Sequence, residues 1–182
     1  MVKNFWKIVD DVLRDADILL LVVDARMIEQ TDNAELRKKA QRLGKQVITV
    51  INKSDLVDKK DLEQWTNKLH PCVFVSAQKY YGVTILRHAI LRYAKATPVT
   101  VGVVGYPNTG KSSVINSLKG KSSAPVSSVS GYTKGRQHIK VDNKIMVIDT
   151  PGVLSQHDDK TDVAFQLTSS MNIKEDPDLV AC

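Results

Sequence analysis

Cysteine and long apolar runs are scarce in this chain. Its 182 residues include only two cysteines, one of them at position 182, so there is neither a disulfide framework nor a cysteine spacing that fits a metal. The most apolar run, Ile18 to Val23, is far too short to span a bilayer, and the first residues lack the basic start and apolar region of a signal peptide. We therefore expect a cytoplasmic protein with no membrane partner.

Acidic residues are outnumbered by basic ones. The chain has 26 lysines and arginines against 20 aspartates and glutamates, a formal net charge of +6. This balance fits a polyanionic partner such as nucleic acid, and equally an ordinary solvated surface. With 42% apolar residues, the chain is long enough for one α/β domain, 1–182, and too short for a second full domain.

Apolar β-rich runs alternate with helical patterns, which predicts βαβ units and a mostly parallel sheet. Strands are expected at 18–23, 46–51, 72–75 and 100–104, and a hairpin at 137–141 and 145–148. Helices are expected at 1–15, 58–68 and 83–94 and from 111 onward. A further helix is expected between a capping box at Asp32 and Glu35 and a stop at Gly44, with Leu36, Ala40 and Leu43 on its inner face.

The segment GYPNTGKS, Gly105 to Ser112, has the spacing of a phosphate-binding loop between an apolar strand and a helical pattern. Backbone N–H groups of such a loop and of the helix N-terminus surround phosphate oxygens. Lys111 is placed to reach the β and γ phosphates, and Ser112 to hold Mg²⁺. The predicted nucleotide contacts of this segment are Gly105, Asn108, Thr109, Gly110, Lys111, Ser112 and Ser113.

A second phosphate-side element is IDTPG, Ile148 to Gly152. Asp149 offers a carboxylate to the Mg²⁺ shell, and Gly152 has no Cβ to keep its N–H from the γ phosphate. On its own, Asp-x-x-Gly is more often a turn. After a phosphate-binding loop it indicates nucleotide chemistry.

The strand that ends in Asn52-Lys53-Ser54-Asp55 predicts guanine recognition. Asp55 can accept hydrogen bonds from the guanine N1–H and exocyclic amine, a donor pair that adenine lacks, so GTP is favoured over ATP. Lys53 can lie along the base, and Asn52 can tie this loop to the phosphate loop. After the next strand, Ser76-Ala77 offers the Ala77 N–H to guanine O6. Without these companion motifs, a turn with surface charge would be the simpler interpretation.

All four segments follow strands, and in an open parallel sheet ligands bind beyond the carboxyl ends of the strands. Their order is unusual, because the base-reading segments, within 16–95, precede the phosphate and switch segments, within 99–170. The chain resembles a circularly permuted Ras-like P-loop GTPase in which Lys95 to Pro98 joins the ends of the unpermuted fold. Asp24-Ala25-Arg26 after the first strand adds a resemblance to the YlqF/RbgA group of ribosome-assembly GTPases.

That resemblance implies an α/β fold whose six-stranded, mostly parallel sheet has one antiparallel edge strand and helices on both faces. It also implies Mg²⁺-dependent hydrolysis of GTP to GDP, coupled to a ribosomal subunit or its rRNA, usually the large one; DNA is not expected. Thr133 matches the family's switch threonine, which closes on Mg²⁺ and the γ phosphate, although Ser130 replaces a usual proline. The predicted catalytic residues are therefore Lys111, Thr133 and Gly152.

The resemblance also points to K⁺ and to slow turnover. In K⁺-stimulated relatives, the residue at the position of Asn108 helps to hold the cation; a loop hydrogen bond is the alternative role. Val153 stands where Ras-like enzymes have a glutamine that positions water. The family's histidine before the first strand has no counterpart, and His157 is either a substitute or an ordinary loop residue.

The family's separate C-terminal RNA-binding domain has no counterpart in the tail, 171–182. RNA contact is then expected from basic residues of the GTPase surface, for which solvated lysines are the alternative interpretation. These residues are Lys119, Lys121, Lys134, Arg136, Lys140 and Lys144. The alternative function is a nucleotide-gated adaptor that binds a protein and hardly turns GTP over.

Overall fold

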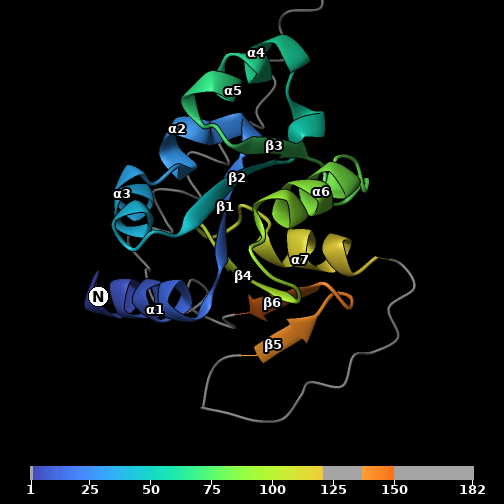
Figure 1. Cartoon of the computed structure of the whole chain (residues 1–182). Helices are drawn as coiled ribbons and strands as arrows, with labels where there is room; N and C mark the ends of the chain where they lie inside the picture. The colour runs from blue at the N-terminus through green and yellow to red at the C-terminus, as the bar shows by residue number, and fades with distance from the viewer. Residues whose placement is uncertain (1, 121–136, 150–182) are drawn as a thin grey trace, which may run out of the picture.

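The computed structural model describes residues 2–120 and 137–149. Within these ranges, six strands form one sheet in the order β3-β2-β1-β4-β6-β5 (Figure 1). They are β1 (Ile18–Asp24), β2 (Gln46–Asn52), β3 (Cys72–Val75), β4 (Val99–Val104), β5 (Gln137–Lys140) and β6 (Ile145–Asp149). Among these strands, all neighbours pair in parallel except β5 and β6, which are antiparallel. The predicted topology is confirmed.

Helices cover both faces of the sheet (Figure 1). One face carries α6 (Val83–Tyr93) and α7 (Lys111–Lys119). The other carries α1 (Val2–Asp15), α3 (Ala34–Arg42), α4 (Lys59–Glu63) and α5 (Trp65–Lys68). Short segments follow the ends of β1 and β2: η1 (Ala25–Met27), α2 (Ile28–Thr31) and η2 (Ser54–Leu56). In the described part of the chain, no helix is long and apolar enough to cross a membrane.

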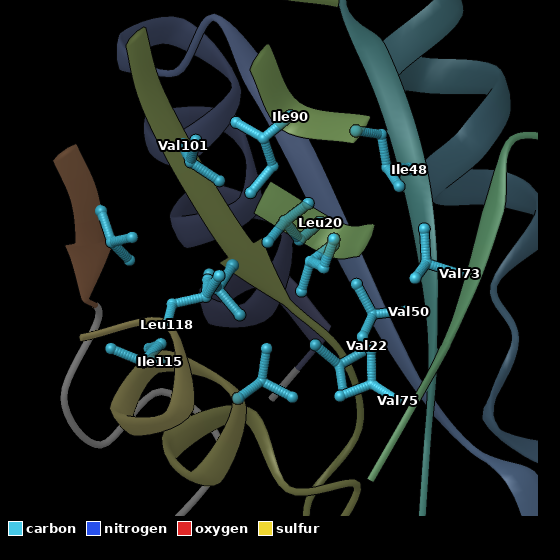
Figure 2. Close-up of a cluster of buried hydrophobic side chains, with 14 of the residues drawn as sticks. Leu20, Val22, Ile48, Val50, Val73, Val75, Ile90, Val101, Ile115 and Leu118 are labelled. Carbon is cyan, nitrogen blue, oxygen red and sulfur yellow. The ribbon is translucent and has the colours of Figure 1, made fainter. Parts of the chain in front are cut away.

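The central strand β1 is buried along its whole length. Leu20 and Val22 enter the cluster beneath α6 and α7, which Figure 2 shows, whereas Leu19 and Leu21 enter the cluster on the opposite face. A strand that is covered on both faces reads as a continuous apolar run, which is why ILLLVV lacks alternation.

The sheet divides into two halves between β1 and β4. The base-reading half, β1 to β3, lies on one side, and the strands of the phosphate half, β4 to β6, lie on the other. Residues 94–98 connect α6 to β4, as the permuted order requires. Because β1 pairs directly with β4, the carboxyl ends of the two halves are adjacent.

Two local predictions in the third helix were wrong. Its N-cap is Asn33, whose side chain accepts from the Leu36 N–H at 2.9 Å. Asp32 is instead the C-cap of α2, and its Oδ1 accepts two hydrogen bonds from the Arg37 guanidinium. Leu43 is 53% exposed rather than inward, since the helix ends at Arg42.

The helix expected over 58–68 is interrupted at Gln64. The Gln64 side-chain amide donates to the Asp61 carbonyl at 2.9 Å. In a continuous helix this carbonyl would accept from the Trp65 N–H, so the side chain competes with the helical hydrogen bond.

Candidate nucleotide-binding site

The loop between β4 and α7 depends on two glycines. At Gly105 (φ 152°), a Cβ would lie 2.3 Å from the Val22 carbonyl oxygen. At Gly110 (φ 91°), a Cβ would lie 2.3 Å from Asn52 Nδ2. Asn108 also has a positive φ, 62°, which asparagine tolerates better than most residues. The loop therefore packs its backbone against the ends of β1 and β2, where a side chain at either glycine would not fit.

Side chains of the same loop hold it through the Tyr106 carbonyl. Thr109 is fully buried and its hydroxyl donates to this oxygen at 2.9 Å. Lys111 Nζ donates to the same oxygen at 2.7 Å. Ser112 is exposed and Ser113 half-buried in the first turn of α7. The Lys111 ammonium is thus bonded to its own loop. If a nucleotide binds there, phosphate oxygens would take the place of the Tyr106 carbonyl as its acceptor.

Asn52 joins the base-reading segment to both of its neighbours. Its side-chain amide donates to the Thr109 carbonyl at 2.9 Å, and its Oδ1 accepts from the Ala77 N–H at 3.2 Å. Asn52 is only 2% exposed, so both hydrogen bonds are shielded from water. The predicted tie between Asn52 and the phosphate loop is present in the structure.

Lys53 makes a second tie. With a left-handed backbone (φ 61°), its Nζ donates to Asp24 Oδ2 and to the Asn108 carbonyl, both at 2.7 Å. The sequence had indicated Asp24 only as part of a family signature. The register places Asp24 opposite Asn52 on the paired strands, but that pairing cannot be known before the strand order is.

Asp24 is a buried, fully bonded carboxylate. It is 2% exposed, and Arg26 donates to it from the backbone N–H, Nε and Nη2. Burial pushes the pKa of Asp24 upward, but the hydrogen bonds from Arg26 and Lys53 outweigh it, so the pKa lies below its usual value. The contact with Asp24 raises the pKa of Arg26 in turn. Asp24 is therefore ionised at neutral pH and fixes Lys53 against the phosphate loop.

Asp55 projects from η2 beside Ser76 and Lys79. The Ser76 hydroxyl contributes most to lowering the pKa of Asp55, followed by Lys79, whose Nζ lies 3.0 Å from Asp55 Oδ2. The Ser76 hydroxyl is buried. Among described side chains, it is the one buried oxygen or nitrogen with no hydrogen-bond partner. The Asp55 carboxylate is thus held ionised, as a receptor for two N–H donors requires.

The two halves of this site match two family models. Residues 2–96 match the model described as "Elongation factor Tu GTP binding domain", and residues 100–181 match "50S ribosome-binding GTPase". The boundary between the matches falls in the connection from α6 to β4. Both halves of the sheet therefore carry GTPase sequence, with the base-reading half first.

Several known proteins are similar to this chain over both halves. The GNP-bound structure of YlqF from T. maritima has a TM-score of 0.58 at 27% identity, covering 89% of this chain and 63% of that one. "Uncharacterized GTP-binding protein MJ1464" of Methanocaldococcus jannaschii is 46% identical over 84% of this chain and 42% of its own length. "Nuclear GTP-binding protein NUG1" of Saccharomyces cerevisiae is 34% identical over 87% of this chain and 36% of its own length.

The chain belongs to the YlqF-like family of circularly permuted GTPases. It spans about two fifths of the length of the curated relatives that it matches.

Several residues predicted for a YlqF-like site cannot be placed. Thr133, Gly152, Val153 and His157 lie outside the described residues. Asp149 is the last residue of β6, and only its backbone position is described.

Among described side chains, no group of three or more His, Cys, Asp or Glu gathers as a metal site. Mg²⁺ bound with a nucleotide needs only one or two protein ligands besides phosphates and water. The exposed Ser112 hydroxyl at the start of α7 fits that requirement.

One predicted contact has a partner that the sequence did not reveal. The Ala77 N–H was expected to be available for guanine O6, but it donates to Asn52 Oδ1. At 3.2 Å this hydrogen bond is long. Its role toward a base stays a prediction, which now requires the N–H to be shared or exchanged.

Proposed function

We propose that this domain binds GTP in preference to ATP and hydrolyses it slowly to GDP with Mg²⁺. The observation that carries the proposal is the joining of two loops at one edge of the sheet. Asn52 and Lys53 of the base-reading segment donate to the carbonyls of Thr109 and Asn108 in the phosphate loop. A base and its phosphates would therefore be held by one connected framework.

Each residue has a distinct role in this proposal. Asp55 accepts from the guanine N1–H and exocyclic amine, and Lys53 lies along the base. Lys111 leaves the Tyr106 carbonyl for the β and γ phosphates, and loop N–H groups orient the phosphates. Ser112, Asp149 and Thr133 are the proposed Mg²⁺ ligands, and Gly152 the γ-phosphate contact. When bound, Mg²⁺ neutralises charge that develops on the phosphate oxygens.

Slow turnover follows from Val153, because an apolar side chain cannot orient the attacking water. Turnover of GTP should be measured under saturating nucleotide for the wild type and for Val153→Gln. The expected result is a low wild-type rate that needs Mg²⁺. Rapid Mg²⁺-independent turnover, or a preference for ATP, would contradict the proposed activity.

K⁺ is the proposed activator, with Asn108 as a ligand. The Asn108 side chain is exposed while its carbonyl is held by Lys53, so the side chain is available to a cation near the phosphates. Hydrolysis should be faster in KCl than in NaCl at equal ionic strength, where general screening is the same. Most of the difference should disappear in Asn108→Ala. Equal rates in both salts would leave Asn108 a loop residue only.

The proposed partner is a ribosomal subunit or its RNA, in the cytoplasm. Of the two subunits, we propose the large one. Support comes from the family model described as a 50S ribosome-binding GTPase over residues 100–181. Turnover and co-sedimentation should be measured with purified large and small subunits in GDP and in a non-hydrolysable GTP analogue. Binding in the analogue state is expected. Stimulation by a protein alone, with no subunit binding in either state, would favour the adaptor function.

A further inference from the structure

One long stretch of the chain carries no negative side chain. From Gln64 to Val141 the sequence contains no aspartate or glutamate, although the residues before it contain both signs of charge at close spacing. This stretch supplies α6, the connection 94–98, α7 and β5. Apart from those near its two ends, its basic residues therefore have no acidic neighbours in the sequence.

The fold brings the ends of these elements to one edge of the sheet. α6 ends at Tyr93 and α7 at Lys119, and β4 and β6 begin as paired neighbours at Val99 and Ile145. The Val99 N–H donates to the Lys144 carbonyl at 2.8 Å. This is the amino edge of the strands, opposite the carboxyl edge that holds the candidate nucleotide site (Figure 1).

Within this edge, the carboxylate of Asp142 and the guanidinium of Arg87 connect α6, α7 and the β5–β6 turn. Arg87 of α6 donates to the Leu118 carbonyl at the end of α7 and pairs with Asp142 in the β5–β6 turn. The other oxygen of Asp142 accepts from the N–H groups of Lys144 and Ile145. Both carboxylate oxygens of Asp142 therefore already have partners, in Arg87 and in the backbone of its own turn. Asp142 is not available to pair with a second cation.

Four exposed cations surround this junction: Arg92, Lys95, Lys140 and Lys144. In the described part of the chain none of them has an ion pair. The opposite face has cations of both kinds: Arg14, Arg37, Lys39 and Lys59 each have an acidic partner, and others have none in the described part of the chain. At the start of β1, the carboxylate of Asp17 accepts a hydrogen bond from the Thr100 N–H of β4 at 2.8 Å.

We propose that Arg92, Lys95, Lys140 and Lys144 form an amino-edge basic surface that binds the phosphate backbone of RNA. The inference rests on the proposed ribosomal function and adds the face by which RNA is bound. Unpaired cations gain most from phosphates where the neighbouring carboxylates already have partners, as Asp142 does, because binding releases condensed counterions and no protein ion pair has to be broken. Since this surface lies opposite the nucleotide edge, RNA and GTP bind together.

The test compares two variants with equal loss of charge. In one, all four residues of the amino-edge basic surface are changed to glutamine. In the other, four exposed cations of α1, α3 and α4, for which the described part of the chain holds no ion pair, are changed likewise: Lys7, Lys38, Arg42 and Lys60. Fluorescently labelled oligouridine and a labelled RNA hairpin are titrated into each protein at several KCl concentrations, with anisotropy as the readout.

The amino-edge variant should bind RNA at least about tenfold more weakly at low salt. The slope of log affinity against log salt should become shallower by roughly 3, from the loss of four phosphate contacts. The control variant should bind like the wild type. Equal losses in both variants would overturn the proposal, because they would indicate non-specific attraction by net charge. Tighter binding of polyglutamate than of RNA would overturn it in favour of an acidic protein partner.

Binding of a fluorescent GTP analogue separates this inference from the proposed function. Both variants should bind it as the wild type does, and Lys111→Ala should keep its RNA affinity while losing nucleotide. If GTP competes with RNA, the RNA lies at the carboxyl edge and the surface is wrongly assigned. If the analogue does not bind the wild type but RNA binding still depends on the four residues, the proposed GTPase function fails while the surface stands.

Discussion

The base-reading half and the phosphate half of the site are built differently. In the former, the side chains of Asp24, Asn52 and Lys53 are bonded to protein groups across strands and loops. In the latter, the loop takes its shape from positive φ angles and glycines, and Lys111 rests on a carbonyl of its own loop. Under the proposed function, the first arrangement is a preorganised receptor for the base, and in the second the Lys111 cation exchanges the Tyr106 carbonyl for phosphate oxygens.

Asp55→Asn should give the largest effect, because it changes which base is accepted. An amide in place of the carboxylate leaves a guanine donor unpaired but can pair with the altered edge of xanthine. The preference for GTP over xanthosine triphosphate should shift by about a thousandfold or more. Competition titrations against a fluorescent GTP analogue measure it. A variant that keeps GTP affinity and still excludes the xanthine nucleotide would show that Asp55 does not read the base.

Lys111→Ala tests the exchangeable cation of the phosphate half. Removing one charged donor to the β and γ oxygens should weaken GTP binding by about tenfold to a hundredfold. Because the Lys111 ammonium donates to the exposed Tyr106 carbonyl of its own loop, thermal stability without nucleotide should change little. Calorimetric titration with GTP, paired with a melting curve, checks both statements. A large stability loss with unchanged affinity would reverse the assignment.

Gly110→Ala tests the close contact between the two halves, because the added Cβ would clash with Asn52. The new Cβ combines a strained φ of 91° with a contact 2.3 Å from Asn52 Nδ2, so unfolding should become easier by about 2–4 kcal/mol. Gly44→Ala is the matched control, since Gly44 also has a positive φ, 64°, but nothing lies within 4 Å of its Cβ. That variant should lose only about 1 kcal/mol. Equal losses in urea unfolding would show that the Asn52 contact is unimportant.

Asp24→Asn should have the smallest effect on nucleotide binding, a few-fold in GTP affinity, by loosening Lys53, and should lower stability by about 1.5–3 kcal/mol because charged donors lose a buried acceptor. The pKa of Asp24 is lowered in the folded state, so its contribution is present above the unfolded pKa and is lost as pH falls through the folded one. Below about pH 4 the variant should therefore approach the wild type in stability. A gap that stays constant with pH, in melting curves across that range, would assign the loss to packing alone.

The sequence predicted the strands more reliably than it predicted helix ends. In the site, the predicted tie from Asn52 to the phosphate loop is present, and the contacts to nucleotide stay predictions. Strand runs such as Ile18 to Val23 and the motif at Asn52 depend on local pattern, and the topology then follows from the rule for parallel sheets. Asp32 was the wrong cap because it ends α2, so that Asn33 caps the next helix, and a short helix of four residues such as α2 has no clear sequence signature. The bond from Lys53 to Asp24 depends on strand register, so only the folded structure reveals it.

The pairing of β1 with β4 has a consequence for the order in which the chain emerges during synthesis. β1 is the central strand, yet β4, which covers one of its edges, follows more than seventy residues later. Until residue 104 has been made, β1 therefore presents an unpaired apolar edge, the kind that templates aggregation. With the permuted order, β1 of the nascent base-reading half therefore stays exposed to aggregation along one edge until β4 has been synthesised.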